Sequence, residues 1–167
     1  MPIAALGFRP HTYWTAVVAL GGDPRAPEVL ERRKVTFAEG DETFVYHAAE
    51  SLSVGAAEAM LAAVRGSTTQ KVTGAVGQLI ADLEAHGIEV RAAAAPRGTL
   101  KVPSSIAEIV KVHAYMHAAE GHFYRDVVAD GCERLGLRLK RPPVPGAGNG
   151  CRDVRQTPLE HRFQRLR

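Results

Sequence analysis

The chain of 167 residues changes from strand-like to helical patterning near residue 53, and this change constrains the fold more than any other feature. Before it, residues 11–20, 29–37 and 43–47 are rich in β-branched and aromatic residues, and short turn-forming segments separate them. Links of this length favour an antiparallel three-stranded meander. After it, two long segments place their apolar residues on one helix face. The sequence therefore predicts an α/β protein.

The first helical segment covers residues 53–86, and Gly87 is placed to end it. Glycines inside this segment weaken the predicted helix and favour a break near Gly66. Residues 88–95 follow as a fourth strand, since their pattern is short, apolar and bounded by turn residues.

The second helical segment covers residues 106–134, and Ser105 with Glu108 forms a capping box at its start. Gly136 ends it, and residues 137–140 form a short fifth strand at a sheet edge. The predicted order is β-β-β-α-β-α-β, a mixed five-stranded sheet with flanking helices.

Residues 3–141 are predicted to form a single domain, because 46% of the chain is hydrophobic and one core can be filled. Residues 142–167 form a Pro/Gly-rich linker and a basic C-terminal arm, predicted to be poorly ordered. From Arg138 onward the chain has eight basic residues against two acidic ones. The arm is either a solvated tail or a contact to nucleic acid or an acidic partner.

The sequence shows no basic leader before an apolar segment and no apolar run long enough to span a membrane. We therefore expect a cytoplasmic protein without membrane contact. Cys132 and Cys151 are too few and too unpatterned for a disulfide framework, and Cys132 is expected to be a small buried side chain.

His113, His117 and Glu120 lie one helical turn apart, and they project onto the apolar face of their helix. Buried polar groups need partners, so this triplet is the main candidate site. A structural His–Glu pair explains part of it, whereas two histidines at i and i+4 also suit a metal ion. All three are predicted as catalytic residues and as ligands of one divalent metal ion. Tyr124 shares their helix face and is included as a ligand-binding residue.

Two further pairs are candidate ligand-binding residues. Arg9 and His11 lie at the entrance to the first predicted strand, whereas His47 and Glu50 lie at the exit of the third. These pairs lie at opposite ends of the predicted meander, so at most one of them joins the triplet. The alternatives are a surface loop for the first pair and ordinary strand-end residues for the second.

Arg65 projects onto the apolar face of the first helix. It is predicted either to pair with Glu120 or an anionic ligand, or to extend its stem past the core rim into solvent.

The order of elements over residues 3–141 resembles that of the ribonuclease H-like superfamily. Active members of that superfamily hold two divalent metals with acidic residues on the first strand, near the end of the fourth strand and on a final helix. Here GFRPHTYWTAVVALGG has no carboxylate, RAAAAPRG has none, and the final segment offers only Asp153 and Glu160 among basic residues. A standard two-metal nuclease is therefore not expected.

Two functions follow from these observations. The first is a module on a ribonuclease H-like scaffold that binds nucleic acid or another anion without the two-metal site. The alternative is a hydrolase or phosphoesterase that uses His113, His117 and Glu120, with one divalent metal ion as cofactor.

Overall fold

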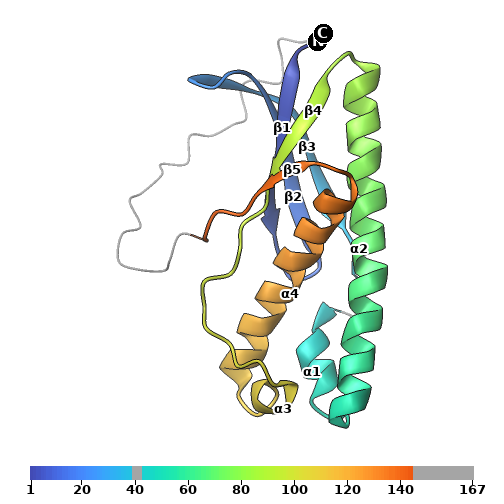
Figure 1. Cartoon of the computed structure of the whole chain (residues 1–167), viewed down its shortest axis with the longest axis vertical. Coiled ribbons are helices and arrows are strands. Elements are labelled where there is room, and N and C mark those ends of the chain that lie inside the picture. Colours follow the sequence, from blue (N-terminus) through green and yellow to red (C-terminus); the bar gives the residue numbers. More distant parts are fainter. Residues whose placement is uncertain (39–42, 145–167) are drawn as a thin grey trace.

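The computed structural model describes residues 1–38 and 43–144, which form an α/β fold with a five-stranded sheet (Figure 1). The elements follow in the order β1 (Ile3–Pro10), β2 (Trp14–Asp23), β3 (Ala26–Thr36), α1 (Val45–Ala49), α2 (Val54–Ala85), β4 (Glu89–Ala94), α3 (Ile106–Ile109), α4 (His113–Arg134) and β5 (Arg138–Lys140).

The sheet is mixed, with the strand order β3-β2-β1-β4-β5. β1 is central, antiparallel to β2 and parallel to β4; β3 is antiparallel to β2, and β5 is parallel to β4. Long helical connections are what parallel pairing requires, and α2 and α4 provide them. The prediction of an α/β fold with a five-stranded mixed sheet and flanking helices is confirmed.

The structure corrects the predicted strands at two places. The chain already forms β1 at Ile3–Pro10, before the strand that was predicted to come first. Two alanines, one glycine and the final proline lower the strand propensity of this segment, so its pairing on both edges decides its conformation.

The predicted third strand at residues 43–47 is wrong, because α1 forms from Val45. A tertiary contact accounts for this helix: the backbone N–H groups of Tyr46 and His47 donate to Oε1 of Glu120, 3.3 and 3.4 Å away. An extended strand would leave that buried carboxylate without these donors.

α2 is one continuous helix, and the break expected near Gly66 does not occur. Thr68 and Thr69 are buried there, so packing holds the weak segment in place. Gly87 ends the helix as predicted and takes a positive φ of 75°.

The single helix predicted from residue 106 is instead the pair α3 and α4, because Val112 between them is extended, with φ −131° and ψ 110°. Ser105 makes no side-chain capping bond, so the predicted capping box is absent. This interruption makes His113 the first residue of α4. Gly136 follows α4 with a positive φ of 71°, as its predicted role as a helix stop requires.

The main core lies between one face of the sheet and the two long helices, α2 and α4. Leu6 and Val17 of the sheet pack there with residues such as Val76 of α2 and Val127 of α4. A second, smaller cluster around Ile109, Met116 and Ala119 includes Tyr46 and so joins α1 to the start of α4. Both clusters bury apolar surface, and together they hold α1 beside α4.

Backbone pairing extends to Val144, beyond the domain boundary predicted at residue 141. The N–H of Arg97 donates to the carbonyl of Pro142, and the N–H of Val144 donates to the carbonyl of Arg97. The rest of the predicted basic arm, including Cys151, lies outside the described residues. Within the described ranges, no helix has the length and apolar character needed to cross a membrane.

Candidate metal centre

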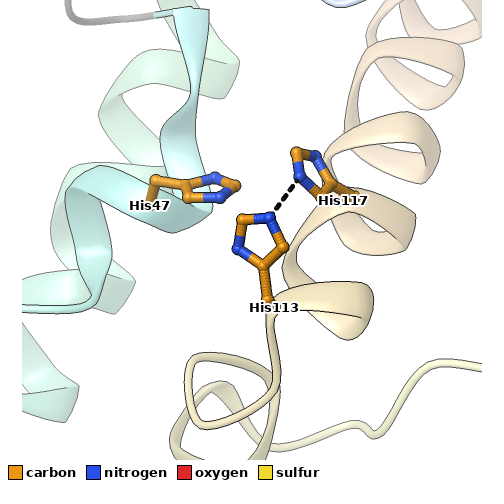
Figure 2. A group of neighbouring side chains, drawn as sticks. All are labelled: His47, His113 and His117. Carbon is orange, nitrogen blue, oxygen red and sulfur yellow. Dashed lines mark hydrogen bonds between the residues drawn. The ribbon is translucent and has the colours of Figure 1, made fainter.

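Three histidines from two helices lie close together (Figure 2). His47 comes from α1, and His113 and His117 come from the first turns of α4. The ring centroid of His47 lies 5.1 Å from that of His113 and 4.9 Å from that of His117. One ring nitrogen of each residue lies within 4.8 Å of the other two. Rotations of the side chains would bring these nitrogens to the separations of roughly 3.4 Å that one zinc-class ion requires.

A hydrogen bond to Glu120 fixes the orientation of the His47 ring. Its side chain is only 3% exposed, and its Oε1 atom is 2.8 Å from Nδ1 of His47. The same oxygen accepts the two backbone N–H groups of α1 described above. A buried carboxylate requires such donors. A proton on Nδ1 completes the bond to Glu120 and leaves Nε2 of His47 as an unprotonated ligand.

His113 and His117 are one helical turn apart, and their Nε2 atoms are 2.9 Å from each other. Two imidazole nitrogens at this distance either share one proton or bind the same cation, since two lone pairs repel. The Nδ1 atom of His117 is 3.7 Å from Oε2 of Glu120, which is too long for a hydrogen bond. His113 and His117 are both exposed, with 52% of the His117 side chain open to solvent.

The surroundings of the cluster favour a positive ion. Burial raises the pKa of the neighbouring Tyr46 phenol; Arg65 lowers it in part, and the negative charges of Asp126 and Glu120 raise it further. The phenol therefore stays neutral at ordinary pH, while the Glu120 carboxylate lies close to His47 and His117. Phe44 covers one edge of His47, with ring centroids 5.8 Å apart.

The donor set fits a metal ion of the zinc class. Three neutral imidazoles and one open position make up a common catalytic zinc site. Tetrahedral ligands at ~2.0–2.1 Å from zinc lie roughly 3.4 Å from each other. The Nε2 atoms of His113 and His117 would therefore separate by about half an ångström, a movement that exposed side chains can make.

The structure brings together all three residues of the predicted triplet and adds His47, which was predicted as ligand-binding. The prediction that both histidines lie on a buried face is corrected, because the turn of α4 that carries them extends beyond the main core. The closest contact of Glu120 is the hydrogen bond to His47, and its role as a metal ligand stays a prediction.

Several predicted site residues do not join the cluster. Glu50 is exposed at the end of α1, and Arg65 pairs with Asp130 at 2.7 Å instead of with Glu120. The buried hydroxyl of Tyr124 donates to the carbonyl of Thr43, which anchors the chain just before α1.

Arg9 and His11 also lie away from the three histidines. Arg9 is exposed on β1, and His11 stacks on Trp14 with ring centroids 4.1 Å apart. Tyr46 and Phe44 at the cluster were not predicted; a helical interpretation of residues 45–49 would have placed them beside His47.

No family model matches this chain, and no curated protein matches it.

Proposed function

We propose that this protein binds one divalent transition-metal ion of the zinc class through His47, His113 and His117. The observation that carries the proposal is the meeting of three ring nitrogens within 4.8 Å, with Glu120 hydrogen-bonded to the ring of one of them. Carboxylate–histidine pairs of this kind orient the metal ligand in many zinc sites.

We further propose that the site catalyses hydrolysis, in line with the hydrolase or phosphoesterase alternative. A zinc-class ion at this place would polarise an ester or phosphoester and lower the pKa of a bound water. The exposure of His113 and His117 supports access for such a substrate. Glu120 acts as a positioning residue, because it fixes the tautomer and the orientation of His47.

A ribonuclease H-like scaffold remains part of the proposal, supported by the observed order of three antiparallel strands, helix, strand, helix and strand. Within the described residues, β1 carries no carboxylate, and the one carboxylate of β4, Glu89, pairs with Arg91. This supports a single-metal site over the two-metal arrangement. The nucleic-acid role proposed for the basic arm stays a prediction.

Metal analysis of the purified protein tests the proposal. We expect about one zinc or cobalt ion per chain, and in the cobalt form a visible absorption spectrum typical of tetrahedral nitrogen ligands. His47→Ala, His113→Ala and His117→Ala should each reduce the bound metal, whereas His86→Ala is the matched control. His86 is exposed at the C-terminal end of α2, and its ring nitrogen Nδ1 lies 2.7 Å from the Asp82 carbonyl.

Equal metal binding by the control and the three variants would overturn the metal site. The metal-loaded protein is then assayed with an aryl phosphodiester and an aryl carboxylic ester. Metal binding without hydrolysis of either substrate would overturn the hydrolytic part and leave a metal-binding protein.

A further inference from the structure

One face of the sheet is covered by α2 and α4, and within residues 1–38 and 43–144 the other face is covered by no helix. We call this second face the open face. It consists of the residues that alternate with the core residues along each strand. Small apolar side chains and one glycine lie in its middle: Ala5, Gly7, Ala16, Val18, Ala92 and Ala94.

Cationic side chains stand at both edges of the open face. Arg32 and Lys34 are exposed on the edge strand β3, and Arg138 and Lys140 are exposed on the opposite edge strand β5. Arg9 adds a further cation on the central strand. The two edges are four strand spacings apart, or roughly 19 Å.

The strand register places these residues in continuous rows. One row runs Lys140, Ala94, Gly7, Val18 and Arg32, each residue paired with the next. A small apolar floor thus joins a cation on one edge to a cation on the other.

The acidic residue on this part of β3 belongs to the other side. Glu31 pairs in register with Ala19, whose side chain is in the core, so Glu31 lies on the helix-covered face. Arg33 lies there too and binds Asp82 of α2 at 2.7 Å. Glu89 is at the far end of the open face and is neutralised by Arg91. The rows that contain Arg9 and Lys140 therefore hold cations without a carboxylate among the described residues.

An aromatic side chain closes one end of the floor. The Nζ atom of Lys34 lies 4.9 Å from the ring centroid of Trp14, and His11 stacks on the same ring. Burial, and then the positive charges of Arg9 and Arg125, lower the pKa of His11. The potential at this end is thus positive even while His11 is neutral.

A hollow of about 520 Å³ lies on the open face, lined by residues that include Gly7, Val18, Ala94 and Pro143. A side chain added at Gly7 would meet no atom nearer than 3.9 Å, so the floor has free space above it. The described chain ends one residue after Pro143. The sequence beyond carries five arginines against two carboxylates, so its net charge does not complement the cationic edges.

We propose that the open face binds single-stranded nucleic acid, with phosphates at the two cationic edges and bases over the apolar floor. The pairing of an apolar floor with cationic edges matches a single strand, which exposes both bases and phosphates. A duplex would offer only phosphates to a flat face, and no described element projects from the open face to enter a groove. This proposal is independent of the metal centre.

Fluorescence anisotropy of the full chain with a labelled oligothymidine tests it. The double variant Arg32→Glu/Lys34→Glu should weaken binding at low salt at least about tenfold, because two phosphate contacts are lost. It should also reduce the slope of log K against log salt by about 1.4, since each contact to a single strand contributes ~0.7. Arg138→Glu/Lys140→Glu tests the opposite edge independently, should the first variant fail to fold.

The matched control is Lys101→Glu/Lys111→Glu, which makes the same change in net charge. Both lysines are exposed in connections outside the sheet, and the control should keep most of the affinity. Equal losses in the control and the edge variants would overturn the proposal. Tighter binding of a duplex of the same sequence, or equal competition by polyglutamate, would also overturn it, in favour of a duplex or an acidic protein segment.

Discussion

Nδ1 of His47 and Oε1 of Glu120 are 2.8 Å apart, although 73 residues separate them in the chain. This hydrogen bond joins α1 to α4 and sets the direction of the one imidazole that does not come from α4. The geometry of the proposed metal centre therefore depends on a carboxylate that need not touch the metal.

Replacing Glu120 separates its positioning role from its structural one. Glu120→Gln keeps an oxygen for the N–H groups of Tyr46 and His47 but removes the carboxylate charge that favours a donating Nδ1. We expect metal affinity to fall about 10–100-fold with small loss of stability. Glu120→Ala should also lower the free energy of unfolding by about 1–3 kcal/mol, because buried donors lose their acceptor. Isothermal titration calorimetry with zinc measures the metal affinity, and urea unfolding measures the stability. Unchanged zinc affinity in Glu120→Gln would contradict the positioning role.

Arg65 provides a test of the corrected ion pair. Because Arg65 binds Asp130 at a partly exposed site, Arg65→Ala should cost less than about 1 kcal/mol in unfolding free energy. Metal content should stay at the wild-type level, since Arg65 makes no contact with Glu120. A loss of bound metal in this variant would contradict the separation of Arg65 from the metal centre.

The buried thiol of Cys132 makes stability depend on pH in the alkaline range. Burial, with a smaller effect of Glu133, raises its pKa from 9.0 to about 12. Between these values the unfolded chain releases a proton that the folded chain keeps, so unfolding becomes more favourable as pH rises. The free energy of unfolding falls by about 1.4 kcal/mol per pH unit between pH 9 and pH 12. Below pH 9 this effect is absent.

Urea unfolding at several pH values measures this effect. Cys132→Ala should be less stable than the wild type at pH 7, because it leaves a small cavity, but its stability should fall less steeply above pH 9. Tyr46 adds a similar fall at higher pH in both proteins, since its pKa is also raised. Parallel pH profiles for the two proteins would contradict the assignment to Cys132.

Gly131 of α4 packs tightly against Val72 of α2. A Cβ atom added there would lie 2.7 Å from Cγ1 of the buried Val72, so Gly131→Ala should destabilise the protein by about 1–3 kcal/mol. Gly74→Ala is the control on α2, where an added Cβ meets nothing within 4 Å. It should stabilise the helix by about 1 kcal/mol, because alanine has the higher helix propensity. Thermal unfolding of the two variants should therefore shift in opposite directions.

Local patterns predicted most of the elements. Apolar spacing found α2 and most of α4, and Gly87 and Gly136 were recognised as the glycines that end them. The same patterns failed at β1, whose small residues have weak strand propensity, and at residues 45–49, where an aromatic and β-branched segment forms a helix. In both places contacts with distant segments outweigh the preference of the residues themselves.

The sequence by itself determined the α/β class and the grouping of His113, His117 and Glu120, because periodicity and i, i+4 spacing are properties of neighbouring residues. Only the tertiary structure decided that His47 completes the group, that Glu120 bonds to it, and that the cations of β3 and β5 share one face. Those relationships depend on which elements pack or pair side by side. Packing depends on many weak contacts between residues far apart in the chain, and a short stretch of sequence does not reveal them.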